Sequence, residues 1–203
     1  MSVSEKYGII ILAAGESARL GRPKQLLEYD RQSLLKRVTR IAKDALDGPV
    51  IVVLGSQGEL LQSEAEEKGV YTIINKDWKE GMGSSVRYGV KYVMDKFPAV
   101  TGLILAVCDQ PFVSANLFEQ LISAHELNHH LIVASEYDNT FGTPAFFDRS
   151  LFPELLELSG DRGAKQIMKK HPEKLGSVYF PLGSRDIDTE EDYQRLLKHN
   201  NDK

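Results

Sequence analysis

Short apolar runs alternate with amphipathic segments along most of this chain, and that alternation is the strongest constraint on its fold. The runs at residues 8–14, 50–54 and 102–107 have the length and composition of buried strands. Between the first two, residues 33–46 carry leucine, valine and isoleucine at helical spacing. Strands that alternate with helices predict an α/β fold, here a doubly wound, mostly parallel sheet with helices on both faces in three α/β/α layers.

The same patterns extend to the end of the chain. We expect strands at residues 8–14, 50–54, 71–74, 102–107, 131–134, 143–147 and 177–180, and helices at 33–46, 57–68, 84–97, 114–128, 164–170 and 189–198. No internal repeat, low-complexity linker or change in composition divides the sequence, which predicts a single domain over residues 1–203. In such a fold, ligands bind outside the carboxyl ends of the strands, where the strand order reverses.

Composition narrows the classes of partner. The net charge is -4 with both signs interspersed, so the chain lacks the basic stripe that follows a nucleic-acid backbone. Its single cysteine, Cys108, excludes an internal disulfide and a cysteine-rich metal site, and indicates a reducing compartment. The apolar run after Lys6 is better interpreted as a buried strand than as a signal peptide, and no run is long enough to span a bilayer. We therefore expect a cytoplasmic protein that binds neither membranes nor nucleic acids.

The segment after the first strand has the chemistry of a polyphosphate site. It leaves the strand through small residues and then presents three cations, Arg19, Arg22 and Lys24. Small residues let backbone N–H groups approach phosphate oxygens, and the cations offset the ligand's charge. The spacing of Gly15 and Gly21 fits neither a Walker A loop nor a dinucleotide-binding G-x-G-x-x-G motif. A tight strand-to-helix connection with solvated arginines is the alternative interpretation.

Acidic residues stand where a metal ligand would be expected. Asp109 follows the strand at 102–107 and precedes a proline turn, so its carboxylate should face the ligand crevice. Carboxylates at such a position suit Mg²⁺, although a turn-forming role explains Asp109 as well. Near the end of the chain, alternation along an extended segment would place Asp186 and Asp188 on one face, away from Ile187. Either could supply a second metal ligand, and helix capping is the simpler alternative.

Two other patterns suggest different chemistry. The segment from His125 to His129 matches the H-E-x-x-H pattern of zinc peptidases, but it lies at the end of an expected helix, where histidines also favour the helix dipole. Cys108 adjoins no basic partner, which favours a buried filler over a nucleophile.

Several motifs, in order, resemble those of the MobA-like nucleotidyltransferase family and, within it, the molybdenum cofactor cytidylyltransferases. The resemblance covers nearly the whole chain and rests on residues 12–15 with Ser17, Arg19, Gly21, Pro23 and Lys24, and on residues 81–85, 108–111, 142–144, 160–164 and 186–189. It implies the Rossmann-like fold of nucleotide-diphospho-sugar transferases.

The resemblance also implies roles for particular residues. The nucleotide would be bound by Leu12, Ala13, Ala14, Gly15, Ser17, Arg19, Lys24, Gly83, Ser84 and Ser85, and the acceptor by Gly142, Thr143, Pro144 and Arg162. Lys24 and Arg19 would contact phosphates, with Asp109 as the third catalytic residue, and Asp109 and Asp188 would hold Mg²⁺. An N-cap role for Ser84 is the structural alternative. Ala13-Ala14, in place of the Gly-Gly of guanylyltransferases, favours CTP, whereas Thr143 departs from the histidine that similar sequences often carry.

The function expected from this resemblance is magnesium-dependent transfer of CMP from CTP to the phosphate of molybdopterin, with release of pyrophosphate. A molybdenum hydroxylase would then be a partner. A guanylyltransferase, or a cytidylyltransferase acting on a sugar phosphate or an alcohol phosphate, is the alternative within the class. Outside it, the alternatives are a non-catalytic carrier of the molybdenum cofactor and a zinc peptidase.

Overall fold

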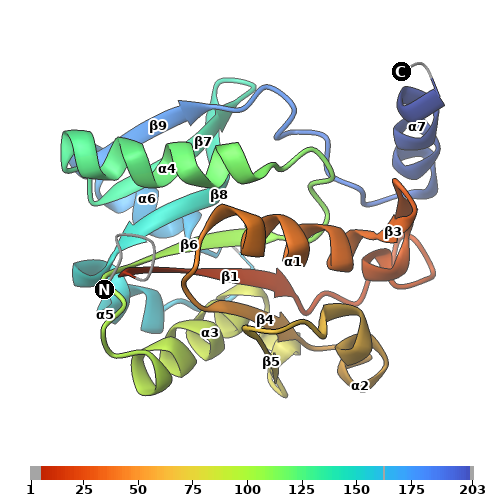
Figure 1. Ribbon diagram of the computed structural model, residues 1–203, viewed down its shortest axis with the longest axis horizontal. Coiled ribbons are helices and arrows are strands. Elements are labelled where there is room, and N and C mark those ends of the chain that lie inside the picture. The colour runs from red at the N-terminus through yellow and green to blue at the C-terminus, as the bar shows by residue number, and fades with distance from the viewer. Residues whose placement is uncertain (1–5, 162, 202–203) are drawn as a thin grey trace.

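The computed structural model describes residues 6–161 and 163–201, which form a central seven-stranded sheet covered by helices (Figure 1). In sheet order, the strands are β5 (Val70–Ile74), β4 (Val50–Leu54), β1 (Tyr7–Ala13), β6 (Gly102–Val107), β8 (Thr140–Asp148), β7 (Ile132–Tyr137) and β9 (Leu175–Tyr179). Strand β8 is antiparallel to both of its neighbours, and the other pairs are parallel. The expected doubly wound, mostly parallel α/β fold is confirmed.

The strand order reverses beside β1. The chain runs outward from β1 to β4 and β5, then returns to the other side of β1 as β6. Because β1 and β6 are parallel neighbours, the loops that leave their carboxyl ends start side by side. This is the place where an open α/β sheet forms a ligand crevice.

Helices cover both faces of the sheet because side chains of each central strand alternate between them. On β1, Ile9 and Ile11 pack toward α1 (Leu34–Ala45) and α4 (Ala115–Asn128), which lie across the near face in Figure 1. Ile10 and Leu12 pack into the opposite core. The helices that contribute to that core are α3 (Met82–Lys96), α5 (Phe152–Leu156) and α6 (Lys165–Lys170). Burying each of these large apolar side chains contributes roughly 1.5–3 kcal/mol, so the sheet is stabilised from both sides.

A small third core lies beyond the carboxyl edge of the sheet. The hairpin of β2 (Glu28–Tyr29) and β3 (Gln32–Ser33) packs there with α7 (Glu190–Asn201), away from the main layers (Figure 1). The buried residues of this core are Leu27, Tyr29, Leu34, Ile187 and Leu196. This packing holds the C-terminal segment that includes α7 next to the loop that follows β1.

Several expected boundaries differ from the structure. The helix expected at 84–97 begins at Met82 after Gly81, so Ser84 lies inside the helix and is not its N-cap. The segment 57–68 forms only α2 (Gly58–Leu61) and a 3-10 turn, Gln62–Ala65. The β2–β3 hairpin, α5 and the short 3-10 turns (Lys24–Leu26, Trp78–Glu80, Arg149–Leu151 and Pro172–Lys174) were not expected.

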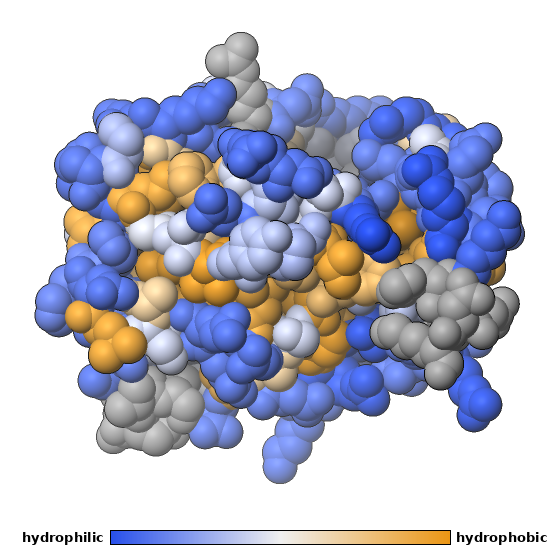
Figure 2. All heavy atoms as spheres, turned by 90° about the horizontal axis from the view of Figure 1, so that it is seen from above, coloured by the Kyte–Doolittle hydropathy of each residue, from blue (hydrophilic) through white to orange (hydrophobic). Residues whose placement is uncertain are grey.

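The face of the molecule on the side of edge strand β9 carries an apolar band (Figure 2). Figure 2 shows this band crossing the middle of the molecule, bordered by polar side chains. Tyr179 of β9 is 75% exposed, and among the described strands β9 pairs only with β7. None of the helices in the described ranges combines the length and apolar character needed to cross a membrane.

Candidate functional site

Lys24 joins two aspartates that are far apart in the sequence. Its Nζ donates to Asp109 Oδ2 at 2.6 Å and to Asp188 Oδ1 at 2.8 Å. Asp109 follows β6, Lys24 begins the 3-10 turn after the β1 loop, and Asp188 precedes α7. The backbone N–H of Ile187 donates to the carbonyl of Asp109 at 3.0 Å, which fixes the C-terminal segment against the β6 loop. The reversal of strand order thus brings the three charged groups together.

The charge state of Lys24 follows from its surroundings. Its side chain is 14% exposed, and burial by itself would lower its pKa. The charge of Asp109 and hydrogen bonds to Asp109 and Asp188 outweigh burial and raise the pKa above its ordinary value. Lys24 therefore stays protonated at neutral pH, so it acts as a fixed cation and not as a base.

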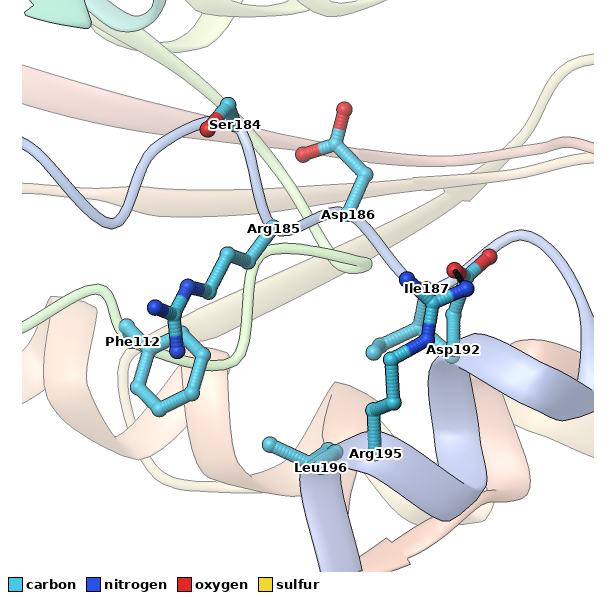
Figure 3. A pocket seen from close by; sticks show the side chains of 8 residues that line it. All are labelled: Phe112, Ser184, Arg185, Asp186, Ile187, Asp192, Arg195 and Leu196. Carbon is cyan, nitrogen blue, oxygen red and sulfur yellow. Dashed lines mark ion pairs between the residues drawn. The ribbon is translucent and has the colours of Figure 1, made fainter. Parts of the chain in front are cut away.

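The neighbouring carboxylates differ in their environment. Burial would raise the pKa of Asp188, but the bonds and charges of Lys24 and Arg19 lower it, and Arg19 reaches Asp188 Oδ2 at 2.7 Å. Desolvation, followed by the charges of Asp109 and Asp188, raises the pKa of Asp186 to about 6. In Figure 3 the Asp186 carboxylate turns away from Arg185 and its neighbour Phe112. The Asp188 carboxylate therefore pairs with Lys24, whereas Asp186 lines the larger cavity described below.

The loop after β1 lines a cavity of about 370 Å³. Its lining residues are Leu12, Ala13, Ala14, Gly15, Glu16, Lys24, Gln25, Trp78, Lys79, Gly81, Met82, Ser85, Val107, Cys108, Asp109 and Asp161. Buried Gln25 fixes the backbone of the loop, because its Nε2 donates to the carbonyls of Ala13 at 2.9 Å and Gly15 at 3.1 Å. Ser17 also serves the loop, since its Oγ accepts from the backbone N–H of Lys24 at 3.0 Å. Of the residues expected to bind nucleotide in this loop, Ser17 and Arg19 do not line the cavity.

The start of α3 contributes one of its three expected residues to this cavity. Ser85 lines it, but Ser84 is fully buried and its Oγ donates to the carbonyls of Asp77 and Gly81 at 3.0 and 2.9 Å. Asn75 ties the pair together, with its Nδ2 2.8 Å from Ser84 Oγ and 3.0 Å from Ser85 Oγ. Gly83 is needed for packing, because a Cβ there would lie 2.9 Å from the backbone N of Ser159. The hydroxyl of Ser84 therefore orders the turn, and only Ser85 faces the space for a ligand.

A second cavity, of about 780 Å³, adjoins the first. Its lining residues are Met82, Val107, Asp109, Tyr137, Thr143, Asp161, Ala164, Lys165, Gln166, Met168, Lys169 and Asp186, and the two cavities share Met82, Val107, Asp109 and Asp161. Two ligands bound in these cavities would meet beside Asp109.

Of the residues expected to bind the acceptor, one lines the second cavity and two pack behind its wall. Thr143 lines the second cavity. A Cβ at Gly142 would lie 2.0 Å from the Tyr137 hydroxyl, so glycine there makes room for that ring. Pro144 is buried, and its carbonyl accepts from Ser135 Oγ at 2.7 Å. Arg162 lies outside the described residues.

Sequence reasoning missed several residues of these cavities. Gln25 and Tyr137 belong to no recognisable motif, and their positions depend on tertiary contacts. Asp161 lies within the motif at 160–164 but was not assigned a role. The sequence could have predicted Lys165 and Lys169 as site residues, because their i, i+4 spacing puts both on one face of an expected helix that follows the motif at 160–164.

Asp109 and Asp188 fit a divalent cation. Because one ammonium group contacts both carboxylates, their oxygens face a common point. Mg²⁺ usually takes one or two protein carboxylates and completes its shell with water and phosphate oxygens. No group of three or more His, Cys, Asp or Glu side chains within residues 6–161 and 163–201 is arranged to hold a metal ion alone. The residues therefore suit a cation held jointly by protein and nucleotide.

The other chemical patterns have structural explanations. The His125 ring packs at 4.3 Å from the Phe146 ring, and its Nδ1 lies 2.8 Å from the carbonyl of His130. His129 is the left-handed C-cap of α4. Burial raises the pKa of the Cys108 thiol to about 12, so it is not a nucleophile at neutral pH.

The chain belongs to the family of MobA-like NTP transferase domains, whose family model matches residues 9–175. It is thus a member of a nucleotidyltransferase family, as the resemblance implied.

Among its relatives is the nicotine blue oxidoreductase of Paenarthrobacter nicotinovorans, 29% identical over 93% of this chain and 95% of the relative. The purine catabolism protein PucB of Bacillus subtilis is 26% identical over the same shares. The crystal structure of Rv0371c from Mycobacterium tuberculosis superposes with a TM-score of 0.83 at 29% identity, over 97% of this chain and 99% of that one. A complex of Rv0371c with manganese superposes with a TM-score of 0.79 at 27% identity, over 97% of this chain and 100% of that one.

Proposed function

We propose that this protein transfers CMP from CTP to the phosphate of molybdopterin, with Mg²⁺ as cofactor and pyrophosphate as the second product. The observation that carries the proposal is the meeting of two cavities at Asp109, beside the Lys24 ammonium. A nucleotide in the cavity of the β1 loop and an acceptor in the larger cavity would have their reacting groups at this junction. The family supports the nucleotidyl transfer, and the residues of the two cavities support the roles given below.

In the proposed reaction, an oxygen of the acceptor phosphate attacks the α-phosphorus of CTP. The bond from that phosphorus to the oxygen bridging to the β-phosphorus breaks, and pyrophosphate leaves with the electron pair. Lys24 stays protonated and offsets the negative charge of the phosphates, while the backbone of the β1 loop orients them. Asp109 and Asp188 would hold Mg²⁺, which when bound supplies further charge neutralisation for phosphate oxygens.

The alanines that line the first cavity favour a pyrimidine nucleotide as the donor. Ala13 and Ala14 are buried and line this cavity. The Ala13 side chain belongs to the core beneath α1, so the methyl group that would occupy space a glycine leaves open is that of Ala14. A methyl group at this position leaves less room beside the loop, which favours cytosine over the larger guanine. CTP is therefore the proposed donor, and GTP is the alternative within the class.

The direct test is a pyrophosphate-release assay with CTP, GTP, ATP or UTP, each with Mg²⁺ and molybdopterin. We expect CTP to give the highest kcat/KM, and we expect Ala14→Gly to lower the preference for CTP over GTP by about tenfold, since pocket shape alone discriminates by roughly 10–200-fold. Pyrophosphate release with GTP, and with none of the other three nucleotides, would identify a guanylyltransferase. Activity with a sugar phosphate or an alcohol phosphate, but not with molybdopterin, would identify another acceptor.

Two results would contradict transferase function altogether. Tight binding of molybdopterin with no pyrophosphate release from any nucleotide would indicate a carrier, which would deliver the cofactor to a molybdenum hydroxylase. Because one relative is named an oxidoreductase, NADH and NADPH oxidation should be measured in parallel. Turnover of either reduced nucleotide without pyrophosphate release would assign this chain to that reaction class.

A further inference from the structure

The larger cavity has an uneven distribution of charge. Three carboxylates line it, those of Asp109, Asp161 and Asp186. Within the described part of the chain, the cations that line it are Lys165 and Lys169. A phosphate entering this space would be repelled by the carboxylates unless these two lysines offset its charge.

Both lysines project from α6 in a way that suits one anionic group. They stand at i and i+4, so their side chains share one face of the helix. Both are exposed, and neither has an ion-pair partner among residues 6–161 and 163–201. Lys170 provides the contrast, because its Nζ pairs with Glu154 Oε2 at 2.7 Å and it does not line the cavity.

Lys24 is less suited to receive the acceptor. Its ammonium already contacts Asp109 and Asp188, and it lines the nucleotide cavity. Lys165 lies four residues beyond Asp161, which lines both cavities, so the start of α6 is close to the junction. Among residues 6–161 and 163–201, the cations that line the acceptor cavity are therefore those of α6.

We propose that Lys165 and Lys169 recognise the phosphate of the acceptor and restrict this cavity to phosphate monoesters. The assignment of the cavity to the acceptor rests on the proposed function. Met82 and Met168 supply polarisable apolar surface for the body of the acceptor, which suits a flat heteroaromatic ring. The lysine pair then holds the attacking phosphate beside the nucleotide.

The test compares binding of a pterin that carries one phosphate monoester with binding of the same pterin without phosphate, in the absence of nucleotide. Pterin fluorescence gives both Kd values for the wild type, for Lys165→Gln/Lys169→Gln and for Lys170→Gln. We expect the wild type and Lys170→Gln to bind the phosphorylated pterin more tightly than the pterin without phosphate, on the order of tenfold or more, as charge-assisted contacts predict. We expect the double variant to bind the two pterins alike, and each single variant to be intermediate.

A steady-state assay supplies a second measurement. The double variant should raise KM for molybdopterin by about tenfold or more and leave KM for CTP within a factor of about two. Equal phosphate preference in the wild type and the double variant, or no preference in the wild type, would overturn the inference. Lysine-dependent binding of the phosphorylated pterin without pyrophosphate release would refute the transferase and leave the anion site standing.

Discussion

Lys24 determines the electrostatics of the candidate site. It lies 85 residues from Asp109 and 164 residues from Asp188 in the sequence, yet its ammonium contacts both carboxylates. The two carboxylates raise the pKa of Lys24, and Lys24, together with Arg19, lowers the pKa of Asp188. Each group of this trio depends on the others.

Replacing Lys24 with methionine should therefore affect catalysis and stability differently. The loss of one preorganised cation should lower kcat for pyrophosphate release on the order of 10²-fold or more. Below the ordinary pKa of aspartate the stability loss should shrink, because Asp188, whose pKa Lys24 lowers in the wild type, is protonated there and no longer needs this partner. Stopped assays for kcat and urea unfolding at pH 3 and pH 7 measure the two effects.

The matched control for this variant is Lys36→Met, which removes an exposed lysine of α1. It should leave both quantities near the wild-type values. Wild-type kcat in Lys24→Met would show that Lys24 does not act on the phosphates.

How far the sequence predicts such a site depends on the kind of residue. The proximity of Lys24 and Asp109 was predictable, because parallel neighbouring strands end at the same edge. The orientation of Ser84 was not, because its hydroxyl is fixed by Asn75, nine residues away, and by the carbonyl of Asp77. The sequence likewise did not predict which of Asp186 and Asp188 pairs with Lys24, since an alternating pattern places both on one face. The segment that carries them is fixed by the packing of Ile187 in the third core.

At the scale of elements, α7 fastens the loop and hairpin that follow β1. Arg22 pairs with Glu190 at 2.8 Å, and its guanidinium lies 5.4 Å from the Tyr193 ring. The hydroxyl of Tyr193 donates to the carbonyl of Glu28 at 2.9 Å. Arg22, which the sequence offered as a phosphate contact, is thus bound to the C-terminal helix.

This arrangement predicts a mild effect for Arg22→Gln. Because the guanidinium serves α7, KM for CTP should change by less than about threefold, within the small effect typical of an exposed ion pair. Hydrogen exchange of residues 17–31 should become faster, since the loop loses one of its contacts with α7. Steady-state kinetics and exchange followed by mass spectrometry measure the two. A tenfold rise in KM with unchanged exchange would instead place Arg22 on the nucleotide.

Elements were predictable where one physical signal dominated. The strands Val50–Leu54 and Gly102–Val107 match the expected bounds, because apolar runs between turns leave little ambiguity. The β2–β3 hairpin was missed because each strand has only two residues, too few for a periodic pattern. The early start of α3 depends on Gly81 and on packing against Gly160, whose carbonyl accepts from the N–H of Gly83.

At the scale of the whole molecule, Tyr7 connects the sheet to the helices of one face. It begins β1, its ring packs edge-on against Phe146 of β8 at 5.5 Å, and its hydroxyl donates to Glu126 Oε1 of α4 at 3.1 Å. Burial, and then the hydrogen bond and charge of Glu126, raise the pKa of Tyr7 to about 12. Contacts within the sheet and with the helix layer on one face thus favour the neutral phenol.

Alkaline unfolding should therefore depend on Tyr7. The ordinary pKa of tyrosine is 10.0, so between about pH 10 and pH 12 the native state holds a proton that the unfolded state releases. The stability that Tyr7 contributes is complete below pH 10 and is lost as the pH rises through 12. Tyr7→Phe should be less stable at pH 8, because it loses the bond to Glu126, and its stability should fall less steeply from pH 10 to pH 12. Urea unfolding across this range measures the slope, with Tyr179→Phe as the control because Tyr179 is 75% exposed. A slope in Tyr7→Phe equal to that of the wild type would show that the Tyr7 hydroxyl does not couple the layers.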